Sequence, residues 1–292
     1  MGCGSWTTDD FKSYSMSRGL STTDDGVRLC KTMSTSQVYT QKSMASELNP
    51  FNVMRECRDT EEHPETVPVI LALDVTGSMG KTAVEVSAEI NTIMTEIYKT
   101  TKDVQFMIMG IGDFAYDDAP LQVSQFESDI RIAEQLDKVY FEFGGGANPY
   151  ESYTAAWAFG ISQCDLDCWK RGKKGIIITM GDEQLNPYIP AEAYRVKTNH
   201  NELDLNTADL YEKASKKYDI YHINVDHRDY HKPRMTEWNN QLGADHVITA
   251  TVKEVPQVIS GIISSRTGGR TTVSAEEGPE VSSIEFTQGI SW

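Results

Sequence analysis

The segment "LALDVTGSMGKT" (71–82) contains two sets of residues suited to different chemistry. Asp74, Thr76 and Ser78 are spaced two apart, and carboxylate and hydroxyl oxygens are hard ligands suited to Mg²⁺ or Mn²⁺. The tripeptide at 80–82 instead matches the end of a phosphate-binding loop, which grips ATP or GTP. The first interpretation predicts a metal-dependent binding module, and the second predicts an NTPase.

The nucleotide interpretation depends on Gly80, Lys81 and Thr82. A phosphate-binding loop reads Gly-x-x-x-x-Gly-Lys-Ser/Thr, which requires its first glycine at position 75. Val75 occupies that position, and a β-branched residue resists the positive φ that the loop needs. The mismatch favours the metal interpretation, with a nucleotide-binding NTPase as the alternative.

The metal interpretation needs more ligands than this segment supplies. Gly77 permits a tight turn that can direct three side-chain oxygens to one point. Because Mg²⁺ takes six ligands at about 2.0–2.1 Å and usually keeps some waters, other loops must contribute. Two alternatives remain open. Thr76 and Ser78 could simply cap the following helix, and a strand ending in aspartate also begins phosphatases of the haloacid dehalogenase type. That class needs a second aspartate where Thr76 stands.

The elements that would position these residues follow from hydrophobic periodicity. Three continuous apolar runs, at 67–74, 104–112 and 175–182, are typical of strands buried on both faces. The pattern predicts further strands at 121–123, 220–226 and 246–250, and helices at 81–100, 128–139, 150–162, 205–218, 233–242 and 252–264. This alternation predicts an α/β domain: a three-layer, doubly wound (Rossmann-like), mostly parallel sheet.

Four aspartates lie at or just past the ends of predicted strands. They are Asp74, Asp113, Asp182 and Asp226. In doubly wound sheets, ligands bind at the carboxyl ends of the strands, near the point where the strand order reverses. The sequence therefore predicts that these carboxylates lie along one edge of the sheet.

Four stretches, in this order, resemble the von Willebrand factor A family. "VILALDVTGSMG" resembles its opening strand and its Asp-x-Ser/Thr-x-Ser metal motif. "MGIGDFAYDDAPLQVSQFESD" and "FGGGANPYES" are similar to the segment after the second strand and the glycine-rich loop of a bacterial or phage-type intracellular branch. "IIITMGDE" resembles the later strand that ends in a second aspartate. The resemblance covers residues 67–265.

The resemblance implies a role for each matched residue. Asp74, Thr76 and Ser78 would bind the ion directly or through water, and Asp182 would be a second, water-bridged contact. In this family the metal-ion-dependent adhesion site binds rather than catalyses, so the chain is expected not to be an enzyme. The ion, Mg²⁺ or Mn²⁺, keeps one position open for an Asp or Glu of a partner protein.

The third loop departs from the family pattern. Where the family has Thr or Asp, the alignment places Asn148, which offers a neutral oxygen, and a slip of one residue would place Ala147, which offers none. A family fold that has lost its metal and acts as a scaffold is therefore a further alternative. We expect Asp113, Glu151, Asp226 and His227 to form the partner-binding rim around the site.

Composition limits the partners and the location. The net charge is −16, which argues against nucleic acid and against anionic membrane surfaces, because both attract positive charge. Five cysteines, an odd number without a regular framework, predict reduced thiols and a cytoplasmic location. Cys164 and Cys168 are four apart, a conceivable half of a zinc site that lacks a matching pair elsewhere.

The chain divides into three parts by composition. Residues 1–62 are rich in Ser, Thr and Asp and are predicted to form an extended polar arm. Alternatively, they are a docking arm that orders on a partner. Residues 63–265 form the predicted domain, and residues 266–292 are predicted to be a flexible tail.

Overall fold

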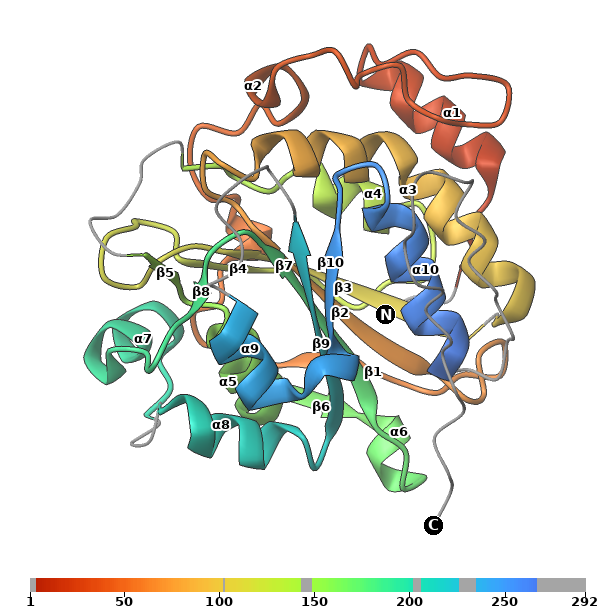
Figure 1. Cartoon of the computed structure of the whole chain (residues 1–292). Coiled ribbons are helices and arrows are strands. Elements are labelled where there is room, and N and C mark those ends of the chain that lie inside the picture. The colour runs from red at the N-terminus through yellow and green to blue at the C-terminus, as the bar shows by residue number, and fades with distance from the viewer. Residues whose placement is uncertain (1–3, 102, 143–148, 202–205, 226–234, 267–292) are drawn as a thin grey trace.

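The computed structural model describes residues 4–101, 103–142, 149–201, 206–225 and 235–266 (Figure 1). Asn148, Asp226 and His227 lie outside the described residues, as does the predicted tail from residue 267 onwards. Within the described ranges, a central sheet is covered by helices on both faces.

Six described strands form the central sheet, in the order β10-β9-β7-β2-β3-β4. All neighbouring pairs are parallel except β3 and β4, which are antiparallel at one edge. The predicted doubly wound, mostly parallel sheet is therefore confirmed. The strands are β2 (Val67–Asp74), β3 (Val104–Ile111), β4 (Leu121–Val123), β7 (Gly175–Gly181), β9 (Tyr218–Val225) and β10 (Val247–Ala250).

The strand order reverses next to β2. The chain passes from β2 to β3 on one side, and β7 then pairs with β2 on the other side. Leu73 of β2 is in register with Met180 of β7, so the two strands end side by side. Asp74 ends β2, and Asp182 directly follows β7. The two aspartates therefore lie at the switch point of the sheet, where such folds bind ligands.

Two apolar cores fill the space between the sheet and its helices. The odd-numbered residues of β2 from 69 to 73 belong to one core, whereas Ile70 and Ala72 belong to the other. This alternation directs the side chain of Asp74 towards the second core. Figure 1 shows the two helical layers. The helices are α3 (Gly80–Thr100), α4 (Arg131–Leu136) and α10 (Val255–Arg266) on the first face, and α5 (Thr154–Ser162), α7 (Ala191–Thr198), α8 (Thr207–Ala214) and α9 (Met235–Leu242) on the second.

The N-terminal segment is packed rather than extended. Its described part forms two helices and a short 3₁₀ turn, α1 (Thr8–Ser17), α2 (Thr35–Val38) and η1 (Ser46–Leu48), and α1 and α2 lie over α3 (Figure 1). Phe11, Leu20 and Val38 are buried in the same core as α3. This differs from the expected polar arm, because several apolar residues of the segment are buried in the core although they follow no helical period. No described helix is both long enough and apolar enough to cross a membrane.

A buried ion pair fastens this segment to the domain. Arg28 and Asp137 are both fully buried, and two hydrogen bonds join them, from Nη1 at 2.8 Å and Nη2 at 2.9 Å. The guanidinium also donates to the hydroxyls of Ser15 and Ser87. Arg18 reaches the same carboxylate at 3.1 Å. A buried charge that is paired and hydrogen-bonded in this way holds its neighbours in a single arrangement.

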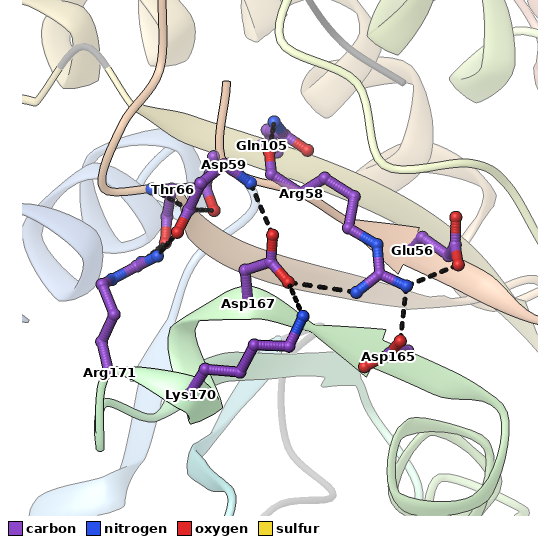
Figure 2. Close-up of polar contacts among 9 residues, drawn as sticks. All are labelled: Glu56, Arg58, Asp59, Thr66, Gln105, Asp165, Asp167, Lys170 and Arg171. Carbon is purple, nitrogen blue, oxygen red and sulfur yellow. Dashed lines mark hydrogen bonds and ion pairs between the residues drawn. The ribbon is translucent and has the colours of Figure 1, made fainter. Parts of the chain in front are cut away.

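A second ionic network lies at the opposite edge of the sheet, near the amino ends of β2 and β7 (Figure 2). Arg58 pairs with Asp165 and donates to Asp167 at 3.1 Å. Asp59 accepts from Arg171 and from the backbone of the segment before β2. These contacts, together with the pairing of β1 (Arg55–Cys57) with β6 (Cys164–Leu166), join the chain before the domain to β6 and α6 (Asp167–Lys170).

Candidate metal-binding site

Four side-chain oxygens follow one another at the carboxyl edge of the sheet. The Thr76 hydroxyl donates to Oδ1 of Asp74 at 2.6 Å and lies 3.3 Å from the Ser78 hydroxyl. Ser78 in turn donates to Oδ1 of Asp182 at 2.9 Å. Two loops that are far apart in sequence therefore bring four oxygens together. The structure places Asp74, Thr76, Ser78 and Asp182 in one group, as the sequence predicts.

The backbone of the first loop explains this convergence. The amide of Val75 still donates to β3, at 2.9 Å from the carbonyl of Ile111, so the strand ladder continues past Asp74. The chain then turns, and α3 begins at Gly80 with Met79 at the N-cap position and no side-chain cap. The Thr76 and Ser78 hydroxyls form hydrogen bonds with carboxylates and with each other. The alternative that these hydroxyls merely cap the helix is therefore not supported.

The oxygen separations suit a small octahedral ion. Adjacent ligands of Mg²⁺, at about 2.0–2.1 Å and 90°, are separated by about 2.9 Å. The three consecutive separations in this group are 2.6, 3.3 and 2.9 Å. Two carboxylates and two hydroxyls are also the hard donors that Mg²⁺ and Mn²⁺ prefer. By number and by chemistry, the described donors fit part of the coordination shell of such an ion.

The electrostatics of the group also favour a cation. Asp74 is fully buried. Burial raises the pKa of its carboxyl to about 7, and the negative charge of Asp182 adds to this effect, whereas hydrogen bonds from Thr76 oppose it. Burying a carboxylate beside a second carboxylate costs free energy. Among the described residues, no cationic side chain pairs with Asp74 within ion-pair distance. A divalent ion at this point would offset that cost.

Tyr153 is a neighbour of the site that the sequence did not reveal. Its hydroxyl donates to Oδ2 of Asp74 at 2.8 Å, and its side chain is fully buried. In the sequence it lies within an aromatic-rich stretch that predicts a helix packed in the core. Such a stretch carries no signal that separates one polar contact from ordinary packing.

Two predicted rim residues are buried instead. Asp113 is 6% exposed and accepts from the amide of Ala115 at 2.8 Å. Glu151 is 7% exposed and lies in β5 (Tyr150–Glu151), which pairs with β8 (Gln184–Leu185). Burial raises the pKa of Glu151 to about 10, and the charges of Asp74 and other nearby acids add to this shift. Neither side chain is freely presented to a partner. The other rim residues, Asp226 and His227, and the loop residue Asn148 lie outside the described chain.

The geometry around residues 80–82 does not favour a phosphate-binding loop. The Lys81 side chain is exposed, whereas Thr82 is fully buried. In a phosphate-binding loop the lysine and the hydroxyl turn towards the same phosphates and their ion. Val75, where the loop needs its first glycine, is bound into the sheet. Nothing in the described residues supports the nucleotide alternative.

The cysteines do not form a metal site in the described part of the chain. Cys30, Cys57, Cys164 and Cys168 are buried and free. Among the described residues there is no group of three or more His, Cys, Asp or Glu side chains that could hold a metal ion. The candidate site therefore depends on hydroxyls as well as on two carboxylates, and a zinc site at Cys164 and Cys168 is not supported.

A cavity of about 990 Å³ lies at the amino edge of the sheet, away from the candidate site. Charged side chains line it, and two of its arginines form ion pairs: Arg266 with Asp219, which also lines the cavity, and Arg171 with Asp59, which does not. These ion pairs offset the charges of the two arginines.

The chain has similar solved structures but no similar curated sequence. No family model matches the chain, and no curated protein matches it. The structure is similar to the pilus adhesin SpaC from Lactobacillus rhamnosus GG, with 14% sequence identity, a TM-score of 0.49, and coverage of 72% of this chain and 31% of the adhesin. The chain therefore spans less than a third of that protein.

Two further solved structures are similar over about the same part of the chain. The vWF domain of the type V pili tip protein Mfa5 from Porphyromonas gingivalis has 14% identity and a TM-score of 0.46, with coverage of 72% of this chain and 98% of that domain. A von Willebrand factor type A protein from Catenulispora acidiphila has 12% identity and a TM-score of 0.42, with coverage of 71% and 44%.

Proposed function

We propose that this chain is a divalent-cation-dependent protein-interaction module of the von Willebrand factor A type. Asp74, Thr76, Ser78 and Asp182 would hold Mg²⁺ or Mn²⁺, and the ion would bind an Asp or Glu of a partner protein. The observation that carries the proposal is the series of four oxygens, whose consecutive separations of 2.6, 3.3 and 2.9 Å match the edges of an octahedral shell.

The charge of the site supports an open position for an acid. Asp74 and Asp182 together balance one divalent ion, and the hydroxyls of Thr76 and Ser78 add no charge. An ion held in this way still attracts another carboxylate, because the interaction at contact distance exceeds the screened repulsion from the net charge of −16. The ion supplies electrostatic attraction at a fixed point, and the proposal assigns no catalytic step.

The same charges limit the kind of partner. An acidic chain disfavours nucleic acid and anionic membranes, so we propose a protein partner whose acidic residue is flanked by neutral or basic ones. The four described cysteines are all free thiols, which is consistent with a reducing compartment and supports a cytoplasmic location as part of the proposal.

The proposal is tested with Mn²⁺ as a paramagnetic probe and acetate as the smallest carboxylate. Manganese bound to the wild-type protein should enhance the relaxation of water protons, because it keeps exchangeable waters. Acetate should lower that enhancement by displacing one of them. No enhancement would contradict the metal site, and it would favour a scaffold that has lost its metal. Enhancement that acetate does not change would contradict carboxylate binding.

A further inference from the structure

The hydroxyl of Tyr153 connects the two loops that carry the candidate ligands. It donates to Oδ2 of Asp74 at 2.8 Å and accepts from the amide of Glu183, the residue after Asp182, at 3.3 Å. The direction of both bonds is fixed, because an amide can only donate and the phenol has one proton. The phenol is therefore a hydrogen-bonded link from the end of β2 to the end of β7, in addition to the bond between Ser78 and Asp182.

The position of this phenol depends on a glycine. A Cβ atom at Gly181 would lie 1.8 Å from the hydroxyl oxygen of Tyr153 and 2.5 Å from its Cζ. Real side chains do not approach this closely, so any other residue at position 181 would displace the phenol. The sequence thus keeps a space open at the last residue of β7, and the Tyr153 hydroxyl occupies it.

The backbone of Glu183 is also held by Trp238. Its carbonyl accepts from the indole Nε1 at 3.2 Å, while its amide donates to Tyr153. The two aromatic rings also contact each other edge to face, with centroids 5.3 Å apart. His222 stacks on Trp238, with centroids 3.6 Å apart. Two rings, one at the N-cap of α5 and one in α9, thus hold the backbone of Glu183 on both sides, and Glu183 directly follows Asp182.

We propose that Tyr153 is a positioning residue of the cation site, holding the Asp74 and Asp182 loops at the separation that the ion requires. This inference rests on the proposed function. With Oδ2 of Asp74 bonded to the phenol, Oδ1 stays on the side of Thr76, in line with the other three oxygens. Groups that orient metal ligands in this way typically affect metal affinity by about 10–100-fold.

The first test compares two tyrosines that differ in their location. Tyr153→Phe removes the hydroxyl and keeps the ring. The matched control is Tyr218→Phe, because Tyr218 is also buried and its hydroxyl donates to the carbonyl of Gly160 at 2.8 Å, away from the site. In a calorimetric titration with Mg²⁺, Tyr153→Phe should weaken binding by about 10–100-fold, and Tyr218→Phe should leave it unchanged. Equal affinities for the wild type and Tyr153→Phe would overturn the inference and leave the proposed function intact.

The second test needs no metal. Hydrogen–deuterium exchange at the Glu183 amide should speed up in Tyr153→Phe, because the acceptor of that amide is removed, and stay unchanged in Tyr218→Phe. An unchanged rate in Tyr153→Phe would overturn the link between the loops. If the wild type binds no Mg²⁺ while the exchange still speeds up, the proposed function and the positioning role both fail, and only the hydrogen-bonded link remains.

Discussion

The Ser78 hydroxyl donates to the carboxylate of Asp182 at 2.9 Å, although 104 positions of sequence separate the two residues. The contact exists because β2 and β7 are neighbours in the sheet and end side by side. In this hydrogen bond the hydroxyl proton faces the carboxylate. When a cation is bound, the hydroxyl oxygen itself can serve as a ligand. The same two residues are therefore suitably placed both without and with a bound cation.

Ser78→Ala tests whether this hydroxyl is a ligand. The substitution should weaken Mg²⁺ binding by about tenfold or more, as for other groups that hold or orient metals. It should change stability little, because Ser78 is exposed. Calorimetry and thermal unfolding measure the two effects. Ser215→Ala is the control, because that hydroxyl donates to a carbonyl at the end of α8. Similar Mg²⁺ affinities of Ser78→Ala and Ser215→Ala would argue against the assignment.

Gly181→Ala tests the space that Tyr153 occupies. The added methyl group would overlap the phenol, so the ring must move, and overpacking of this kind costs about 1–3 kcal/mol of stability. The variant should also bind Mg²⁺ more weakly. Urea unfolding and calorimetry report the two changes. The control is Gly160→Ala, where the new Cβ would lie 3.3 Å from the Tyr218 ring and should be accommodated by a small shift. A Gly181→Ala variant as stable as the wild type would show that the phenol is not held there.

His222 predicts a pH dependence of stability. Burial lowers its pKa from 6.5 to about 3, and its Nε2 has no hydrogen-bond partner among the described residues. Below pH 6.5 the unfolded chain therefore binds a proton that the folded chain does not bind until about pH 3. The free energy of unfolding should fall by about 1.4 kcal/mol per pH unit as the pH decreases through this window.

The variant that isolates this proton is His222→Gln. The free energy of unfolding is measured with urea, in the presence of EDTA, between pH 6.5 and 5, which lies above the range in which ordinary carboxyls titrate. In this range it should change less steeply with pH in His222→Gln than in the wild type, because the variant lacks the one proton that His222 takes up on unfolding. The other titrating groups are common to both proteins and cancel in the difference. Equal slopes would mean that His222 takes up its proton in the folded state.

The buried Arg28–Asp137 pair predicts that the N-terminal segment stabilises the domain. Arg28→Met keeps much of the side-chain volume but leaves Asp137 with Arg18 as its cationic partner. Breaking a buried ion pair typically costs about 3–5 kcal/mol of stability. Because Arg18 still pairs with Asp137, we expect the loss of stability to be near the lower value. Chemical unfolding measures it. Arg195→Met, at an exposed pair on α7, should have little effect. A similarly small effect of Arg28→Met would mean that the segment is only loosely attached.

The strands of the sheet could be predicted from the sequence because they are buried on both faces. The expected range 67–74 coincides with β2, and 104–112 and 175–182 differ from β3 and β7 by one residue at the end. The predicted helix at 150–162 was less accurate. Tyr150 and Glu151 form a short strand instead, because they pair with residues 184–185, and the local pattern contains no information about such distant partners.

The site was predictable to the extent that it depends on strand ends. Asp74 and Asp182 end neighbouring strands, and two hydroxyls follow the first at regular spacing, so their convergence follows from topology. The burial of Asp113 and Glu151 did not follow, because it depends on how loops fold over the edge of the sheet. The contact from Tyr153 could not be foreseen either, because it requires the space above Gly181.

The most direct test of the central claim is a calorimetric titration of the wild type with Mg²⁺ at pH 8, where Asp74, with a pKa of about 7, is largely ionised. Asp74→Asn removes one of the two carboxylate charges at the site. The control, Asp245→Asn, removes the charge of an exposed aspartate elsewhere. We predict saturable binding of one Mg²⁺ by the wild type and by Asp245→Asn, and none by Asp74→Asn. Binding that survives in Asp74→Asn, or that is absent from the wild type, would contradict the account.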